Sequence, residues 1–376
     1  MSFYRQADLN KPIFSQKIQQ MSSITHISTA VPDFKNEQSA IQQFMLKMND
    51  GSPTDKRKMG LMYARSGIET RYSVIPDYSC AASERAFFSK NEDLEPFPSI
   101  EQRMDKYQET ALPLALKAVE NTFGNLHLSQ NITHVISVSC TGMSAPGLDV
   151  ELVQALQLPT DIHRTSVNFM GCYAAIHALK QADAICKSDA KAKVLIVLVE
   201  LCTLHFQKEN KIDFITSNLL FGDGAACCLV ENSDKGMQLE GFYSKLFLES
   251  QESMGWHISS HGFLMSLKQE VPSLIEDNIA DFVETSLSKN NKQKNEIQNW
   301  AIHPGGRKIL DVTAKSLGIG SEAISESYEV LKNYGNMSSC TLLFILEKIK
   351  KQKSGLTFVA GFGPGITMES LILNSL

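Results

Sequence analysis

The chain carries a thiol, an imidazole and a carboxamide in settings suited to acyl transfer. Cys172 follows Gly171, His303 directly follows the apolar run 300–302, and Asn336 follows Gly335. A thiol accepts an acyl group as a thioester, a histidine acts as a base or polarises a carbonyl, and an amide donates a hydrogen bond without titrating. Together these groups predict thioester chemistry, in which a polarised carbonyl becomes a carbon nucleophile or electrophile.

Each of the three residues also has a purely structural interpretation. Free cysteines are commonly buried in cores, histidines satisfy turn carbonyls, and Asn is a preferred helix N-cap. Taken alone, Cys172 and Asn336 favour that interpretation. The catalytic interpretation depends on the wider pattern and carries two expectations. A helix N-terminus favours the Cys172 thiolate, and His303 holds that thiolate as an ion pair.

The elements that position these residues begin in the first half of the chain. The run 134–139 is typical of a buried strand, and a helix is expected from about Gly147. A second helix follows Cys172, with apolar residues at helical spacing along one side. The run 194–199 then predicts another buried strand.

The second half of the chain repeats this order of elements. A strand is expected over 300–302, a helix after His303, a second helix after Asn336 and a closing strand over 356–360. The interval from His303 to Asn336 is 33 residues, against 32 in the corresponding part of the first half. Matching intervals in a matching order predict a duplicated unit.

Alternation of strands and helices makes each unit α/β, with largely parallel strands. The polar stretch 231–236 separates an N-terminal half carrying the thiol (1–235) from a C-terminal half carrying the imidazole and the amide (236–376). Ligands of such sheets gather outside the carboxyl ends of strands. The three polar residues are therefore expected to converge where the halves meet.

Composition and charge exclude several other classes of protein. At 376 residues with a net charge of −5, the chain is long enough for a large core and lacks the basic excess of a nucleic-acid-binding protein. Its eight cysteines form no C-x-x-C pair and no zinc-ligand spacing, so reduced thiols in the cytoplasm are expected. No apolar run reaches the length of a membrane span, and residues 1–20 lack one of signal-peptide length.

The order Cys172, His303, Asn336, with the motifs LFGDGAA at 220–226 and GFGPG at 361–365, resembles the type III polyketide synthases. These are the chalcone-synthase-like enzymes of the thiolase fold. The resemblance extends over nearly the whole chain and is closer to bacterial members. It implies a thiolase-like, duplicated αβαβα layered fold, a homodimer, and an enzyme with no permanently bound cofactor and no separate carrier protein.

The resemblance also implies a reaction sequence. A starter acyl group moves from coenzyme A to Cys172, and malonyl-CoA then loses carbon dioxide while His303 and Asn336 stabilise the enolate. The carbanion attacks the acyl-enzyme, and repeated rounds give a polyketide that cyclises in the same cavity. These roles agree with the chemistry of the side chains, because neutral donors stabilise an enolate without quenching it.

Further residues are assigned to the substrate cavity by the resemblance alone. Phe221 and Met265 match the two gatekeeping positions, and Trp256 stands where plant members have glycine, so its indole closes off or redirects part of the cavity. Ala145, with Pro146, matches the loop that lines the partner's cavity. The remaining cavity positions are Thr141, Glu200, Cys202, His205, Gly363 and Pro364. Structural alternatives stay open for Phe221 as a core aromatic and for His205 as a satisfied buried histidine.

The coenzyme A site follows from the same resemblance. Lys58 and Arg65 match basic residues that contact the nucleotide, although Leu61 replaces a third. A pantetheine tunnel is expected to have walls formed by Gly305, Gly306 and Ser338.

Two other functions remain open from sequence. One is an initiating ketoacyl-acyl carrier protein synthase of the same fold, and the other is a catalytically silent homologue that acts as a binding partner. The product also stays open. We favour a fatty acyl starter, which gives alkylresorcinols or alkylpyrones, whereas the Trp256 indole equally suits a short starter or malonyl alone.

Overall fold

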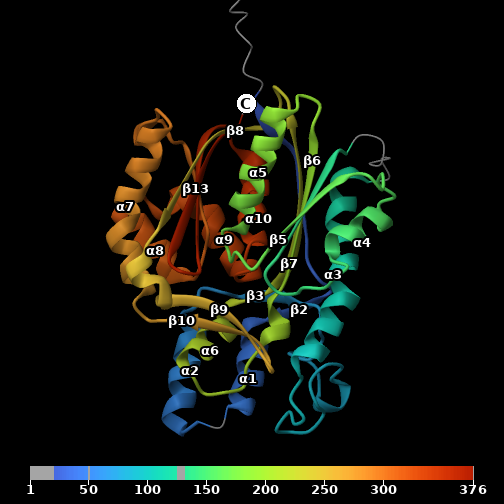
Figure 1. Ribbon diagram of the computed structural model, residues 1–376. Helices are drawn as coiled ribbons and strands as arrows, with labels where there is room; N and C mark the ends of the chain where they lie inside the picture. Colours follow the sequence, from blue (N-terminus) through green and yellow to red (C-terminus); the bar gives the residue numbers. More distant parts are fainter. Residues whose placement is uncertain (1–20, 50, 125–131, 376) are drawn as a thin grey trace, which may run out of the picture.

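The computed structural model describes residues 21–49, 51–124 and 132–375 (Figure 1). The N-terminal segment 1–20, in which no signal peptide was expected, lies outside the described residues. Within the described part, a nine-stranded sheet runs in the order β11-β12-β13-β8-β1-β7-β6-β4-β5. Its strands are β1 (Ser22–Ala30), β4 (His134–Ser139), β5 (His163–Asn168), β6 (Lys193–Leu201), β7 (Asp223–Asn232), β8 (Met237–Leu246), β11 (Asn299–Ile302), β12 (Gly355–Gly363) and β13 (Thr367–Ser375).

Helices cover both faces of this sheet, and two short hairpins complete the fold (Figure 1). The hairpins pair β2 (Phe34–Glu37) with β3 (Thr70–Ser73) and β9 (Met254–Ser259) with β10 (Gly262–Leu267). The helices are α1 (Gln38–Met48), α2 (Pro53–Arg65), α3 (Ile100–Phe123), α4 (Leu148–Ala155), α5 (Ala174–Ser188), α6 (Ile212–Leu220), α7 (Val271–Lys289), α8 (Arg307–Leu317), α9 (Ser325–Tyr334) and α10 (Cys340–Gln352). Short 3-10 helices are η1 (Ala82–Glu84), η3 (Cys202–His205), η4 (Leu248–Ser253), η5 (Lys294–Glu296) and η6 (Ser321–Ile324).

The expectation of largely parallel strands is wrong for this sheet. Parallel pairing joins β4 to β5, β4 to β6 and β11 to β12. All the other neighbours pair antiparallel, which places β13, β8, β1 and β7 as an antiparallel centre between the two parallel parts of the sheet. Apolar runs predicted the strands, whereas direction depends on the connections, which periodicity does not reveal.

The two halves of the chain occupy adjoining parts of one sheet. Four strands of the C-terminal half lie on one side and five of the N-terminal half on the other, joined where β1 pairs with β8. The polar stretch 231–236 is the connection between β7 and β8. A division into halves at 235/236 stays a prediction.

Helices α5 and α10 begin shortly after two of the candidate catalytic residues, Cys172 and Asn336. Helix α5 buries Ile176, Leu179 and Ala182 at helical spacing, and α10 is apolar over most of its circumference. A helix without a polar face is stable only when it is surrounded by protein. Both helices therefore pack in one core with β6, β7 and β12 (Figure 1), and their starts are fixed by that packing.

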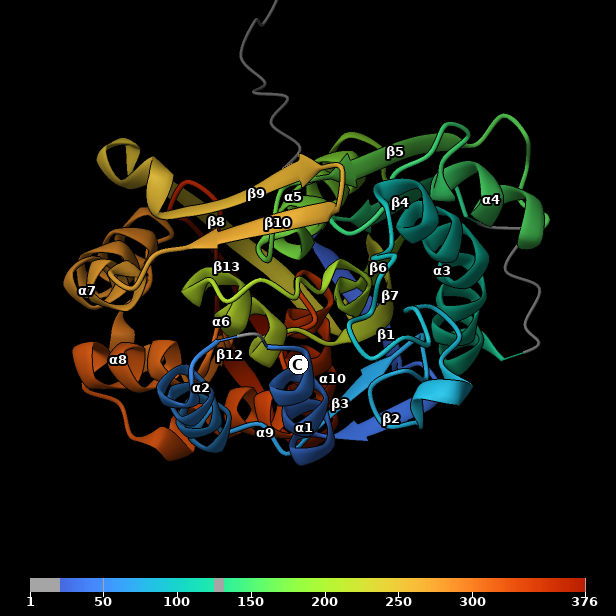
Figure 2. The same cartoon turned by 90° about the horizontal axis from the view of Figure 1, so that it is seen from below.

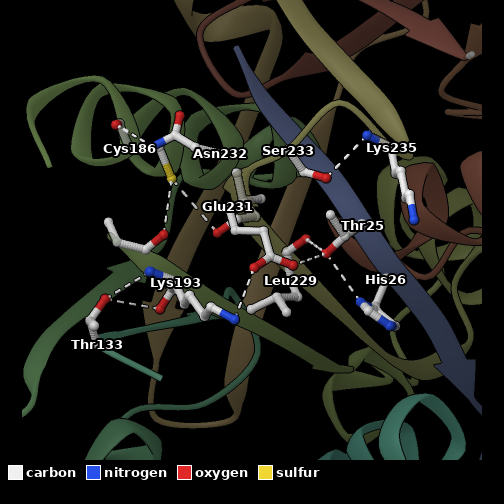
Figure 3. A network of polar contacts seen from close by, with 12 residues as sticks. Thr25, His26, Thr133, Cys186, Lys193, Leu229, Glu231, Asn232, Ser233 and Lys235 are labelled. Atoms are coloured by element: carbon white, nitrogen blue, oxygen red, sulfur yellow. Dashed lines mark hydrogen bonds and ion pairs between the residues drawn. The ribbon is translucent and has the colours of Figure 1, made fainter. Parts of the chain in front are cut away.

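Polar contacts tie the strands together at the end of the sheet remote from those helix starts (Figure 3). The Glu231 carboxylate accepts a hydrogen bond from Thr25 Oγ1 at 2.8 Å and pairs with Lys193 Nζ at 3.2 Å. The Asn232 amide donates to the carbonyl of Cys186 at 2.8 Å, near the end of α5. These contacts join β1, β6 and β7 to one another and β7 to the end of α5.

Helices α1, α2 and α6 and the β9–β10 hairpin form the lower part of the molecule (Figures 1 and 2). Helix α2 begins with a capping box between Ser52 and Asp55 and has Pro53 in its first turn, which fixes its start. Among the described residues, we find no helix with both the length and the apolar content needed to cross a bilayer.

Candidate active site

A cavity of about 590 Å³ brings Cys172, His303 and Asn336 together. Its outer walls come from α2, α6 and the starts of α7 and α8. Figure 2 shows these helices from below. The convergence expected from sequence is therefore present in the structure. The three side chains come from the turn before α5, the end of β11 and the turn before α10.

The turn that carries Cys172 requires glycine before it. Gly171 has a φ of +89°, and a Cβ there would lie 2.2 Å from Cδ of Pro364. Gly363 is constrained in the same way, because a Cβ would lie 2.5 Å from the ring of Tyr173. The loop 363–364 thus packs on the turn that carries Cys172, and Pro364 lines the hollow beside it.

His303 continues from β11 into a tight turn. Its N–H donates to the carbonyl of Ala360 at 2.8 Å, and its carbonyl accepts from Gly305 N at 3.0 Å. The side chain is 1% exposed, and neither ring nitrogen has a hydrogen-bond partner in the described part of the chain. Burial lowers the pKa of His303 to about 3. A neutral imidazole with both nitrogens uncommitted therefore faces the cavity.

Backbone contacts on both sides hold Asn336. Its N–H donates to the carbonyl of Leu220 at 2.9 Å, and its carbonyl accepts from Gly222 N at 3.0 Å. The side-chain Oδ1 accepts from Ser338 N at 2.8 Å. That bond fixes the amide orientation and identifies Nδ2 as the donor atom of the side chain.

The surroundings of Cys172 act against ionisation of its thiol. Burial raises the pKa of Cys172 to about 12, reinforced by the charge of Glu200 and opposed by hydrogen bonds with Ser338 and Asn336. Burial also lowers the pKa of His303. The expected thiolate and its ion pair with His303 stay predictions.

Glu200 is fully buried beneath the site and does not line the main cavity. Its carboxylate accepts from Cys140 N and Thr141 Oγ1, each at 3.0 Å, and from Ser339 Oγ. Burial raises the pKa of Glu200 to about 7, against the opposing effect of these bonds. Glu200 therefore shapes the wall of the site through Thr141 and Cys140.

A second hollow of about 30 Å³ adjoins Cys172 and continues the main cavity inward. Phe221 and Met265, the expected gatekeepers, line both spaces. Trp256 closes the far side, and its Nε1–H donates to the carbonyl of Cys140 at 2.7 Å. The indole is thus held as a wall, as its bulk suggested. The other side chains in this hollow are Thr141, Cys202, Met254, Ser338 and Pro364.

His205 is held by hydrogen bonds at both ring nitrogens. Nδ1 accepts from Phe263 N at 3.0 Å, so Nε2–H donates to the carbonyl of Thr141 at 2.7 Å. The ring stacks on Phe263 with centroids 4.2 Å apart, and burial lowers the pKa of His205 to about 3. The satisfied buried histidine, one of the two interpretations left open, fits this geometry.

Basic side chains surround the opening of the main cavity. Arg65 is among them, together with Lys268, Arg307 and Lys308, whereas Lys58 lies on α2 outside the lining. Gly305 and Gly306 line the passage as expected. Ser338 and Ala145 do not line it, and Ser338 instead borders the inner hollow.

Sequence reasoning missed three contributors to the site. Arg307 and Lys308 directly follow the glycines of the passage, so their position after Gly306 was an available clue. Cys140 directly follows β4, at the position that corresponds to His303 in the duplicated unit, and its Sγ accepts from Gly171 N at 3.1 Å.

Comparison with known proteins agrees with this geometry. The family model for the N-terminal domain of chalcone and stilbene synthases matches residues 10–234, and the model for the C-terminal domain matches 238–376. The chain belongs to this family. As a chalcone and stilbene synthase homologue it is a type III polyketide synthase, and by reaction class it is an acyltransferase.

Relatives of the chain come from bacteria and plants. It is 33% identical to the alpha-pyrone synthesis polyketide synthase-like Pks18 of Mycobacterium tuberculosis, over 86% of this chain and 83% of that protein. A putative chalcone synthase of Bacillus subtilis is 29% identical, over 94% and 99% respectively. Type III polyketide synthase A of Arabidopsis thaliana is 30% identical, over 85% and 84%.

Solved structures of the family share the fold. PKS-I from the brown alga Ectocarpus siliculosus superposes with a TM-score of 0.86 at 26% identity, covering 95% of this chain and 98% of that one. The C-terminal type III polyketide synthase domain of Steely1 from Dictyostelium also gives 0.86, at 25% identity and with 94% and 99% covered. The thiolase-like, duplicated and layered α/β architecture implied by the sequence is confirmed.

Proposed function

We propose that this type III polyketide synthase loads a long-chain acyl group from coenzyme A onto Cys172 and extends it with malonyl-CoA. The product then cyclises to an alkylpyrone or alkylresorcinol. The observation that carries the proposal is the shared cavity, in which a thiol, an uncommitted neutral imidazole and an oriented amide face one space. We assign the reaction to the cytoplasm, where a free thiol stays reduced.

Loading begins with a proton transfer. As the sulfur of Cys172 attacks the thioester carbonyl, its proton passes to His303, and the amide of Asn336 donates to the oxyanion that forms. The imidazolium then returns the proton to the departing coenzyme A sulfur. His303 is neutral again at the end, and the acyl group is a thioester of Cys172.

Extension requires a stabilised carbanion. Malonyl-CoA breaks its bond to the carboxylate, carbon dioxide leaves, and the electron pair moves into the thioester carbonyl. The enolate oxygen accepts hydrogen bonds from one N–H of His303 and from Nδ2 of Asn336. Both donors are neutral, and His303 has a lowered pKa, so neither readily protonates the carbanion. The enolate carbon then attacks the acyl-enzyme, and the Cys172 sulfur leaves.

Several side chains favour an alkyl starter. The cavity wall includes Leu219, Leu220, Met254, Met265 and Leu267, which are apolar and, for methionine, adaptable in shape. The similarity to an enzyme named for alpha-pyrone synthesis points the same way. The fixed indole of Trp256 limits the inner hollow, so an alkyl chain lies in the main cavity rather than behind that wall.

The opening of the cavity fits the phosphates of coenzyme A. Its described lining includes four cations and no carboxylate, although the whole chain carries a net charge of −5. Arg307 reaches across to the end of α2, where its Cδ lies 3.0 Å from the position of a Cβ on Gly67. Arg307 and Arg65 therefore both line the cavity close to the end of α2, and paired guanidinium groups suit phosphate.

A second copy of the chain completes the proposed enzyme. Strand β5 ends the sheet with β4 as its neighbour, and five of its six residues are exposed. An uncovered edge strand offers unpaired backbone groups to another strand. Beside it, Met143 and Val150 are 40% and 36% exposed, in the segment that includes Ala145. We propose that two copies pair along β5.

The product assay tests the proposed function. Incubation with malonyl-CoA and acyl-CoA starters from two carbons to long chains is expected to give pyrones or resorcinols, most rapidly from long chains, as read by mass spectrometry. Carbon dioxide release should accompany each extension. Turnover of acyl-carrier-protein thioesters, with no product from any coenzyme A thioester, would instead identify an initiating ketoacyl synthase.

Substitutions of the two candidate basic residues on α2, Arg65 and Lys58, test the proposed phosphate site. Arg65→Ala is expected to raise KM for malonyl-CoA about tenfold with little change in kcat, because a charge-assisted hydrogen bond contributes about 1.5 kcal/mol. Lys58→Ala, outside the lining, should change KM less than about twofold on the same reasoning. Equal effects of the two substitutions would contradict this placement.

Sedimentation equilibrium tests the pairing of two copies. The wild-type chain should sediment as a dimer, and the double substitution Met143→Glu with Val150→Glu should shift it toward a monomer, because it places like charges in an apolar contact. Leu248→Glu, at a residue 69% exposed on η4, is the control and should leave the dimer intact. A monomeric wild-type protein at micromolar concentration would refute the proposal.

A further inference from the structure

Two large apolar side chains stand exposed where the main cavity opens. Leu61 on α2 is 49% exposed, and Ile212, the first residue of α6, is 42% exposed. Both line the cavity that contains Cys172, and α2 and α6 lie side by side at the lower end of the molecule (Figures 1 and 2). Exposed apolar side chains that share one rim and are surrounded by polar residues are typical of an interaction site.

The exposed stripe of α2 places Leu61 among cations. Arg57 precedes it by four residues, Lys58 by three, and Arg65 follows it by four, so these side chains share one side of the helix. All four residues are exposed, whereas the opposite side of α2 is buried in the protein. An apolar residue flanked by cations along an exposed helix is typical of a helix that lies on an anionic surface.

Most cations near this opening have no carboxylate partner. Within the described part of the chain, no ion pair includes Arg57, Lys58, Arg65, Lys268 or Lys308. Of the other two, Lys211 pairs with Glu209 at 2.5 Å, and Arg307 lies 3.9 Å from Asp311. Since the described cavity lining also holds no carboxylate, the rim attracts anions although the chain as a whole is acidic.

A lipid surface with anionic head groups matches both features of the rim. Its phosphates attract the cations, and its apolar layer accepts Leu61 and Ile212. Two such signals together hold a protein at a membrane that either signal alone holds only weakly. A long-chain acyl thioester partitions into the same surface through its methylene groups, so the opening would face the phase that contains the starter.

We propose that the rim of the cavity, formed by the exposed stripe of α2 and the start of α6, docks the protein on an anionic lipid surface. Leu61 and Ile212 enter the apolar layer, and the cations stay at the head groups. The contact is peripheral and reversible, so malonyl-CoA still enters from water. This inference deepens the proposed function, because it rests on a long-chain starter that reaches the opening from the lipid.

Sedimentation of the full chain with vesicles tests the docking. Vesicles of phosphatidylcholine and phosphatidylglycerol in equal parts are compared with vesicles of phosphatidylcholine alone. At low salt the protein should bind the anionic vesicles about tenfold more tightly than the neutral ones, and high salt should release it, because ions screen the attraction. Absence of binding to anionic vesicles at low salt would refute the proposal.

The double substitution Leu61→Glu with Ile212→Glu locates the contact. It removes both apolar side chains and adds two negative charges at exposed positions, so the affinity for anionic vesicles should fall about tenfold while circular dichroism shows a retained fold. Leu246→Glu with Leu248→Glu is the matched control. These residues are 64% and 69% exposed and lie outside the cavity lining, so this variant should bind as the wild-type protein does. An equal effect of the two double substitutions would contradict the location at the rim.

Other occupants of the rim predict different results. Binding of an acidic acyl carrier protein that is lost in Leu61→Glu with Ile212→Glu, in a protein that does not bind vesicles, would identify a protein partner and overturn the proposal. Self-association lost in the same variant, again without vesicle binding, would identify a second copy of the chain and overturn it equally.

Failure of the docking and failure of the proposed function give different results, because vesicle binding needs no substrate. Product from long-chain acyl-CoA in a protein that does not bind vesicles would refute the docking and leave the proposed function intact. Binding to anionic vesicles through the rim, with no product from any acyl-CoA, would support the docking surface and refute the proposed function.

Discussion

The arrangement of the site depends on one buried carboxylate. Glu200, at the end of β6, accepts hydrogen bonds from Cys140 and Thr141 at the end of β4 and from Ser339 at the start of α10. A buried carboxylate is tolerated only when donors replace its water, and these three do so from both halves of the chain. Glu200 thereby fixes the wall of the Cys172 hollow relative to the turn that carries Asn336.

This constraint has a chemical cost at Cys172. The same carboxylate that joins the halves raises the pKa of the thiol, in addition to the effect of burial. The site compensates with neutral donors, and His303 keeps both ring nitrogens uncommitted. Neutral donors suit enolate chemistry, because an acid would quench a carbanion.

Sequence reasoning succeeded where local patterns determine structure. Apolar runs predicted β4, β6, β11 and β12, and helices were expected at the positions of α5 and α10, since such patterns reflect burial directly. Cys172, His303 and Asn336 were identified because each follows a strand or precedes a helix, and their cavity is a consequence of the repeated topology.

The remaining features depend on contacts between distant segments. Strand direction at the centre of the sheet follows from connections. The raised pKa of Cys172 follows from burial and from the charge of Glu200, neither of which a motif encodes. Ser338 looked like a tunnel residue because its neighbours in sequence line the site, but it borders the inner hollow instead. The packing of Arg307 on Gly67 is likewise a contact between distant segments.

Acyl loading is the most direct test of the central claim that one thiol in this cavity carries the chain. The wild-type protein is mixed with a long-chain acyl-CoA, digested, and its peptides are weighed by mass spectrometry. The acyl mass should appear on the Cys172 peptide and be absent in Cys172→Ala, which should still decarboxylate malonyl-CoA through His303 and Asn336. Acylation of another cysteine, or loss of both activities in a folded Cys172→Ala protein, would contradict the account.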